Sequence, residues 1–254
     1  MYLVICMAGK NTRFHDVGFD VPKALLPWKD KTVINAILSN LTQNYSFEKI
    51  ILLPNRRDKS FLNMLLESVA EFGIGNDDIY FVPDTKGQAH TAAIACQYLI
   101  DRGVSENSRI AFHNADTILI NRDCKQIDAA LDDHDAYVDI FPASSPMYSY
   151  ARLDRNRVTE IVEKKVISAF ACSGFYAFSS ISSYFQIYNK LCGTADAAEA
   201  SEIFIADVLS QILKENGDIA SSHINQETGT VVLGTPVEYG LELAKAEAEK
   251  YHRL

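Results

Sequence analysis

Short apolar runs rich in valine and isoleucine alternate along this chain with segments whose apolar residues recur every three or four positions. The short runs predict β-strands at Tyr2–Met7, Lys49–Leu53, Ile79–Val82, Arg109–Phe112 and Ala136–Phe141. The periodic segments predict helices at Thr32–Leu41, Arg57–Phe72 and Ala89–Arg102, the last two closed by Gly73 and Gly103. Such alternation predicts an α/β fold, a mostly parallel sheet with helices on both faces.

The pattern changes after Phe141. Residues 148–164 indicate two short strands around a polar turn at Asp154–Arg157, which predicts a small antiparallel insertion laid over the sheet. A further strand is predicted at 172–178 and a helix at Glu202–Asn216, ended by Gly217. Thr235, Pro236 and Glu238 predict a capping box that opens a last helix, Pro236–His252. Without repeats or a linker, residues 1–254 are interpreted as one domain.

Composition narrows the classes of function. The net charge of −9 argues against nucleic acid as the main partner, because binding to a phosphate backbone needs a broad basic surface. No stretch approaches the roughly 20 apolar residues of a membrane span. The chain has five cysteines, an odd number, and no CxxC pair. This favours buried, reduced thiols in a cytoplasmic protein.

The loop after the first predicted strand, Ala8–Arg13, has the composition of an anion site. Gly9 allows close approach of the backbone, and Asn11 tolerates a left-handed conformation, so successive N–H groups can surround a phosphate. Pro22 then fixes the backbone before Lys23, a second cation beside Arg13. The alternative is a plain connection with solvated cations. Neither GxxxxGKS/T nor GxGxxG is present here, which excludes an ordinary P-loop and disfavours a dinucleotide-binding dehydrogenase.

At these residues the chain resembles the sugar-phosphate nucleotidylyltransferases, a Rossmann-like pyrophosphorylase family with a first loop G-x-G-S/T-R-F/L/M and a later P-K pair. Here the loop is Gly9–Phe14 and the pair is Pro22-Lys23, with Asn11 in place of the second glycine. The resemblance implies that about residues 1–120 bind the nucleotide and about 121–254 the acceptor. The nucleotide-binding residues it implies are Met7, Ala8, Gly9, Lys10, Asn11, Thr12, Arg13, Lys23, Gly87, Gln88 and Ala89.

The resemblance assigns Gly87-Gln88-Ala89 to the base and ribose of a nucleoside triphosphate. Gln88 offers a donor and an acceptor to a base edge, and Gly87 lets a base lie against the backbone. Taken alone, this segment would be an ordinary helix start. Nothing in it selects one base, although the family resemblance favours a pyrimidine triphosphate such as CTP, UTP or dTTP.

The resemblance also makes Asp116 a ligand of Mg²⁺, since it follows a predicted strand and Mg²⁺ takes few protein carboxylates. The alternative is a helix cap. Ile118 stands where a glycosyltransferase with a D-x-D metal site would have its second aspartate, which argues against that class of enzyme. Val232 departs from the family, which has a second metal-binding aspartate there. Either Asp116 with water and phosphate oxygens is enough to hold the ion, or another carboxylate, Glu202 or Asp207, serves instead.

Glu163 and Lys164 match the family's V-E-K segment, which binds the acceptor's body and its phosphate, and Gly174 matches a strand that lines the acceptor pocket. The alternatives are a solvated ion pair at a strand end and a β-bulge.

The resemblance therefore predicts a nucleotidyltransferase with Arg13, Lys23, Asp116 and Lys164 as its catalytic residues. The acceptor is expected to be a phosphorylated small molecule, a sugar 1-phosphate for surface polysaccharide such as capsule, or a non-sugar phosphate such as phosphocholine used with CTP. Two other hypotheses remain: a non-catalytic nucleotide-binding regulatory protein, motivated by Val232, and a purely structural protein. The 13 phenylalanines and 12 tyrosines are compatible with a homodimer.

Overall fold

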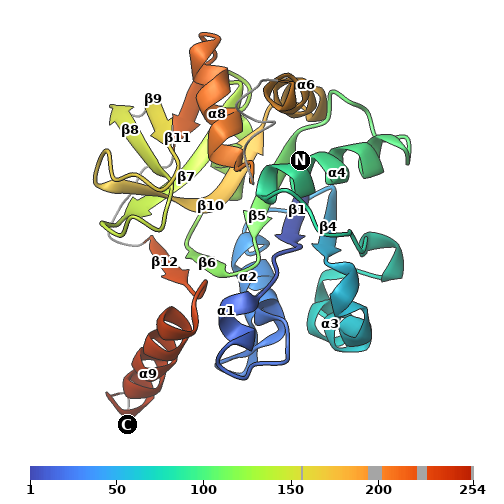
Figure 1. The fold of residues 1–254 in the computed structure, drawn as a ribbon, viewed down its shortest axis with the longest axis vertical. Coiled ribbons are helices and arrows are strands. Elements are labelled where there is room, and N and C mark those ends of the chain that lie inside the picture. Colours follow the sequence, from blue (N-terminus) through green and yellow to red (C-terminus); the bar gives the residue numbers. More distant parts are fainter. Residues whose placement is uncertain (156, 194–201, 222–227, 253–254) are drawn as a thin grey trace.

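The fold of the chain, in a computed structural model that describes residues 1–155, 157–193, 202–221 and 228–252, is built on a central eight-stranded sheet (Figure 1). The strand order is β4-β1-β5-β10-β7-β11-β9-β8. Only β9 and β10 run against the other strands. The bounds are β1 Tyr2–Met7, β4 Lys49–Pro54, β5 Ile110–Asn114, β7 Ala136–Pro142, β8 Tyr150–Asp154, β9 Arg157–Val162, β10 Phe170–Phe178 and β11 Ile219–Ser221. The mostly parallel, Rossmann-like sheet is confirmed.

Two short antiparallel pairs stand beside this sheet, and helices cover it. The pairs are β2 (Pro27–Trp28) with β3 (Lys31–Thr32), and β6 (Thr117–Ile120) with β12 (Gly229–Val232). The helices are α1 Thr12–His15, α2 Val33–Leu41, α3 Leu62–Val69, α4 Gln88–Ile100, α5 Cys124–Ala130, α6 Ile181–Cys192, α8 Ile205–Lys214 and α9 Pro236–His252. Helix α9 carries the chain away from the sheet to its C-terminus (Figure 1).

Two hydrophobic cores lie on opposite faces of the sheet, because side chains alternate along each strand. Leu3 and Ile5 of β1 face the core formed with α2 and α3. Val4 faces the other core, formed with α4, α6 and α8. These three residues of β1 are fully buried, so the strand is a well-packed base for the loop at its carboxyl end.

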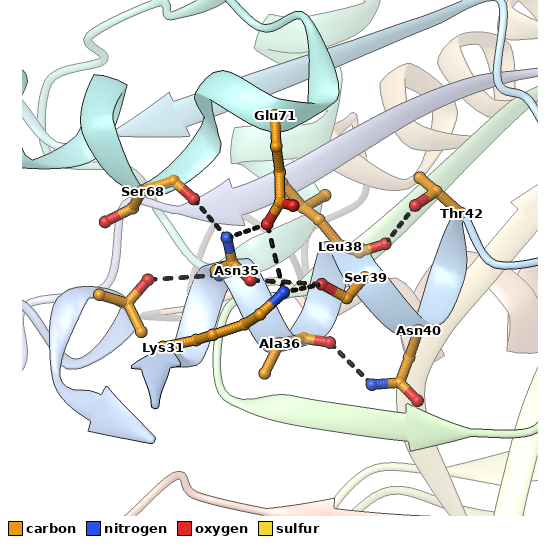
Figure 2. Close-up of polar contacts among 10 residues, drawn as sticks. Lys31, Asn35, Ala36, Leu38, Ser39, Asn40, Thr42, Ser68 and Glu71 are labelled. Carbon is orange, nitrogen blue, oxygen red and sulfur yellow. Dashed lines mark hydrogen bonds and ion pairs between the residues drawn. The ribbon is translucent and has the colours of Figure 1, made fainter. Parts of the chain in front are cut away.

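The polar side of α2 is tied to the end of α3 by a cluster of side chains (Figure 2). The Asn35 amide donates to the Ser68 carbonyl at 2.9 Å and to the Glu71 carboxylate at 2.6 Å. Lys31 lies 3.3 Å from the same carboxylate. The Thr32 hydroxyl accepts from the Asn35 N–H and caps the helix, so α2 begins where the sequence predicts it.

Two predicted elements were wrong in detail. Ile79–Val82 is not a strand: it makes only isolated bridges to Leu52 and Asn55 at the sheet edge. Arg57–Phe72 is not one α-helix, since α3 is flanked by 3₁₀ turns at Arg56–Phe61 and Ala70–Phe72. The Asn55 side chain accepts from the Arg57 N–H and starts the first turn early. Gly73 does end this segment, with a left-handed φ of 69°.

The second half of the chain also differs from its prediction in three places. Strands β8 and β9 pair as expected around their polar turn, but they join the end of the sheet instead of lying over it. Helix α8 begins at Ile205, not at 202, because the Asp207 carboxylate accepts from the Phe204 N–H at 2.8 Å. Helix α9 begins at Pro236 as predicted. The Thr235 hydroxyl accepts from the Glu238 N–H at 3.2 Å, which is one half of a capping box. In place of the other half, the Glu238 carboxylate accepts from the Thr235 hydroxyl at 2.9 Å and not from the Thr235 N–H.

Among the described residues, no helix is both long and apolar enough to cross a membrane. All five cysteines are free thiols. Three of them are buried as expected, but Cys6 is half-buried and Cys192 is exposed.

Candidate active site

An open cleft of about 560 Å³ lies at the carboxyl ends of β1 and β5. This is the edge at which α/β sheets bind ligands. It gathers most of the residues that the sequence singled out, from segments far apart in the chain: Met7 to Arg13, Lys23, Gly87, Gln88, Asp116, Glu163 and Lys164.

The first loop takes the conformation that its sequence predicts. Asn11 has a left-handed backbone, with φ 53° and ψ 18°, and so adopts the conformation that a glycine would adopt at this position. The next residues form the short helix α1, whose Phe14 is buried against Phe19 and Tyr239 and anchors the loop from below. The loop backbone and Arg13 are left facing the cleft.

Lys23 and Asp116, 93 residues apart, meet in the cleft. The Lys23 ammonium lies 2.5 Å from Asp116 Oδ2. Pro22 precedes a 3₁₀ turn in which Ala24 and Leu25 are buried, so the lysine is held between a fixed backbone and two apolar anchors. Burial by itself would raise the pKa of Asp116, but the charge and hydrogen bond of Lys23 outweigh it and hold that pKa below its usual value. The Asp116 carboxylate is therefore ionised at neutral pH.

Gly87 occupies a position that only glycine can fill. Its φ is 90° and ψ 178°, and a Cβ there would overlap the backbone of Ile203. Ile203 crosses this turn through two backbone hydrogen bonds, its N–H to the Lys86 carbonyl at 2.9 Å and its carbonyl to the Ala89 N–H at 3.1 Å. Ala89 is therefore fully buried and outside the cleft, so the structure does not place it with the other predicted nucleotide-binding residues.

Gly87→Ala is expected to destabilise the fold more than Gly18→Ala. Both glycines have φ 90°, so each substitution strains the backbone by about 1–3 kcal/mol, but a Cβ on Gly18 meets open space. Contact with the Ile203 backbone should add about 1–3 kcal/mol for Gly87. Urea unfolding of the two variants checks this, and equal losses would show that Ile203 does not press on the turn.

Glu163 and Lys164 also line the cleft. Glu163 accepts a hydrogen bond from the Ser149 hydroxyl, and its Oε1 lies 3.7 Å from the Lys164 ammonium. The same ammonium lies 4.2 Å from the centre of the Phe204 ring, a cation–π contact. Burial raises the pKa of Glu163 above its usual 4.5, in spite of Ser149 and Lys164.

Glu163→Gln should gain stability relative to the native protein as pH rises. Because the folded-state pKa of Glu163 is raised, its protonated form favours folding; that contribution is complete below about pH 4.5 and is lost as pH rises through the folded pKa. Glutamine has no proton to lose. We expect the thermal midpoint of the variant, relative to the native protein, to be higher at neutral pH than at about pH 4. A difference independent of pH would contradict the raised pKa.

Gly174 belongs to a bulge in β10, as its alternative interpretation predicted. The register with β7 shifts between Cys172 and Tyr176, and Gly174 has φ 93°. A Cβ there would overlap the Asn114 side chain, whose Oδ1 accepts a hydrogen bond from the Gln88 amide. Gly174 thus lies behind the cleft and leaves room for Asn114, instead of lining the cleft itself.

Of the two carboxylates that the sequence offered as replacements for a second metal ligand, one lines the cleft with Asp116. Val232, at the family's aspartate position, pairs with Thr117 in the β12–β6 ladder and is apolar. Asp207 caps α8, whereas Glu202 lines the cleft. A further carboxylate is that of Glu238: its Oε2 and Asp116 Oδ2 lie 3.6 Å and 3.2 Å from the point that a Cβ on Gly234 would occupy.

Several cleft residues escaped the sequence analysis. Asp84 and Thr85 lie three and two positions before Gly87, and Tyr148 and Ser149 precede β8, so proximity to predicted elements was a usable signal for these four. Phe204 reaches the cleft only through tertiary packing, whereas Cys172 and Tyr176 belong to the predicted strand 172–178 that the resemblance placed at the acceptor pocket.

A cationic loop after the first strand, with a lysine and a carboxylate paired beyond it, defines an α/β protein with a cleft suited to phosphorylated ligands. The family model described as nucleotidyl transferase matches residues 2–231, and the chain belongs to that family. It is therefore a nucleotidyltransferase, and the family inferred from the first loop is confirmed.

Three of the solved structures that share this fold illustrate its range, although their sequence identity to this chain is low. A nucleoside-diphosphate-sugar pyrophosphorylase from Vibrio cholerae RC9 has 23% identity and a TM-score of 0.82, with 95% of this chain and 99% of that chain covered. UDP-glucose pyrophosphorylase complexed with UDP-glucose has 20% identity and a TM-score of 0.74, with 98% of each chain covered. The inositol-1-phosphate CTP transferase from T. maritima has 12% identity and a TM-score of 0.68, covering 95% and 94%. Curated protein sequences give no significant match.

Proposed function

We propose that this enzyme transfers a nucleoside monophosphate from a nucleoside triphosphate to a phosphorylated small molecule and releases pyrophosphate. The observation that carries the proposal is the Lys23–Asp116 pair, 2.5 Å apart, in the cleft beside the first loop. The Lys23 ammonium can bind the negative charge of a triphosphate, and the Asp116 carboxylate can bind the metal ion that accompanies it.

The triphosphate would bind along the first loop, with Arg13 and Lys23 as its cations. Met7, Ala8, Gly9, Lys10, Asn11 and Thr12 supply the backbone and side-chain groups around it, and all of them line the cleft. Gly87 and Gln88 would contact the base. In this proposal residues 1–120 form the nucleotide half of one domain and residues 121–254 the acceptor half.

Asp116 is the residue that would hold Mg²⁺. Its carboxylate is ionised and lines the cleft. The Glu238 carboxylate is near it, because both would contact a Cβ placed on Gly234. Within the described ranges no group of three or more His, Cys, Asp or Glu side chains is arranged around a metal position, and Mg²⁺ does not require one because it takes few protein carboxylates. These residues fit the ion, which when bound would supply positive charge at the α-phosphate.

The chain's own residues would then act by positioning. An oxygen of the acceptor's phosphate attacks the α-phosphorus, the bond to the bridging oxygen of pyrophosphate breaks, and pyrophosphate leaves. The acceptor phosphate is largely ionised near neutral pH because its second pKa is about 6, so no general base is needed. Lys164 would hold that phosphate, Glu163 the body of the acceptor, and Arg13 and Lys23 the charge of the triphosphate.

For the acceptor we favour a sugar 1-phosphate used in surface polysaccharide, such as capsule, because solved relatives of this fold include sugar pyrophosphorylases. A CTP-dependent reaction on a non-sugar phosphate is the second candidate, favoured by the fold shared with an inositol-1-phosphate CTP transferase. We place the reaction in the cytoplasm, where nucleoside triphosphates are made. A homodimer remains part of the proposal.

Val232 favours one rival function, a nucleotide-binding regulatory protein without turnover. Pyrophosphate release separates the two: the enzyme is mixed with Mg²⁺, each of five nucleoside triphosphates, and a panel of sugar 1-phosphates, inositol 1-phosphate and phosphocholine. Release that needs both a triphosphate and one acceptor, and that disappears in Asp116→Asn, supports catalysis. Triphosphate binding with no release from any pair would support the regulatory protein instead.

A further inference from the structure

Asp84 is a charged side chain at the nucleotide end of the cleft that the proposed reaction does not use. The buried amide of Asn55 holds it in place: Nδ2 lies 2.9 Å from Asp84 Oδ1 and 3.4 Å from the Ala8 carbonyl. Asn55 thus joins the loop of Asp84 to the first loop. Asp84 therefore borders the space between the proposed triphosphate loop and Gly87.

The Asp84 carboxylate is ionised, and one of its two oxygens has a hydrogen-bond partner in the protein while the other is available to a ligand. The Asn55 hydrogen bond, with help from the Arg57 charge, lowers its pKa below the usual value. Both Asn55 and the Arg57 guanidinium contact Oδ1. None of the described residues donates a hydrogen bond to Oδ2, and the side chain is 63% exposed. Oδ2 is thus a fixed acceptor that a ligand in the cleft can reach.

The two hydroxyl donors nearest to Asp84 are already engaged with protein atoms. The Thr85 and Thr91 hydroxyls lie 2.9 Å apart and also contact the Gly87 carbonyl. The Gln88 amide donates one hydrogen bond to Asn114 Oδ1, which leaves its second N–H and its carbonyl oxygen for a ligand. Lys10 also lines the cleft, so the free side-chain acceptors at this end, Asp84 Oδ2 and Gln88 Oε1, stand beside two donors.

We propose that Asp84 is a specificity residue that selects a triphosphate whose base carries an exocyclic amino group, as cytosine does, over uracil and thymine. An acceptor-only carboxylate pairs with an amino N–H, such as cytosine N4. Uracil and thymine present a carbonyl oxygen at that position, and its lone pairs repel the carboxylate. Guanine and adenine share the amino chemistry, so the test includes them. The inference rests on the proposed function.

The test is the dissociation constant of CTP, GTP, ATP, UTP and dTTP, measured by titration calorimetry with Mg²⁺ on the native protein and two variants. Asp84→Asn keeps an oxygen acceptor for Asn55 but replaces the free acceptor oxygen with an NH2 group, which donates. Asp132→Asn is the matched control: Asp132 is 66% exposed, is paired with the guanidinium of Arg109, and lies outside the cleft.

We expect the native protein to bind at least one amino-bearing triphosphate tenfold or more tighter than UTP and dTTP. Asp84→Asn should reduce that ratio to about threefold or less, while Asp132→Asn leaves it unchanged. Equal binding of all five, a preference for UTP or dTTP, or a ratio that Asp84→Asn leaves intact overturns the inference but not the proposed function. Binding of none of the five overturns both.

Discussion

Replacing Lys23 by methionine is expected to lower the rate of nucleotidyl transfer by about 10²–10³, and to weaken triphosphate binding. Lys23 is a fixed ammonium in the cleft, where removing one preorganised electrostatic contact costs about 3–4 kcal/mol of transition-state stabilisation. Methionine keeps the length and apolar stem of lysine, so the change is mainly one of charge. Steady-state pyrophosphate release gives kcat, and calorimetry gives the affinity for the triphosphate.

Lys31→Met is the matched control for this variant. Lys31 also contacts a carboxylate, that of Glu71 at 3.3 Å, but it belongs to the α2–α3 cluster of Figure 2 and not to the cleft. It should leave kcat and affinity within about twofold of the native values, since exposed ion pairs contribute little. Equal effects of the two variants would mean that Lys23 acts through general stability and not on the triphosphate.

Arg122→Met is expected to lower the free energy of unfolding by about 3–5 kcal/mol. The Arg122 guanidinium lies 2.7 Å from Asp139 Oδ1, and their side chains are only 5% and 0% exposed. The substitution would leave the Asp139 charge buried without its partner. Thermal unfolding should detect a fall of roughly 2–4 °C per kcal/mol for a chain of this size.

The double variant Arg122→Met, Asp139→Leu tests whether the buried charge is the cause. An apolar pair of similar volume often matches or exceeds a buried ion pair, so most of the lost stability should return. Arg122 also donates to the Gly229 carbonyl at 3.2 Å and to the Thr230 hydroxyl at 2.9 Å in β12. A double variant as unstable as the single one would therefore assign the loss to these β12 contacts.

The parts of the site that sequence could predict are those set by local chemistry. Asn11 takes the left-handed backbone expected of it, and Pro22 fixes the turn before Lys23. The family resemblance assigned Lys23 and Asp116 to one site, but their direct contact was not predicted and is a finding of the structure. The first two inferences needed only residue type and position in the loop.

The parts that sequence could not predict depend on packing between distant segments. Nothing local shows that Ile203 crosses the turn at Gly87 and takes the Ala89 N–H, because that contact joins residues more than a hundred positions apart. The apolar segment Ile79–Val82 has the composition of a strand but meets only the sheet edge. The charged pair Arg122–Asp139 is buried, which composition would not suggest, since such side chains are rarely buried unless paired.

The central claim, a magnesium-dependent triphosphate site built on the first loop and Lys23, is tested most directly by thermal unfolding. Native protein and Lys23→Met are heated with each of five nucleoside triphosphates, with and without Mg²⁺. A ligand at 100 times its dissociation constant stabilises by about 2.7 kcal/mol, which should raise the native midpoint by several degrees. We predict such a rise with at least one triphosphate, dependent on Mg²⁺ and much reduced in Lys23→Met. No rise with any triphosphate, or an equal rise in the variant, would contradict the account.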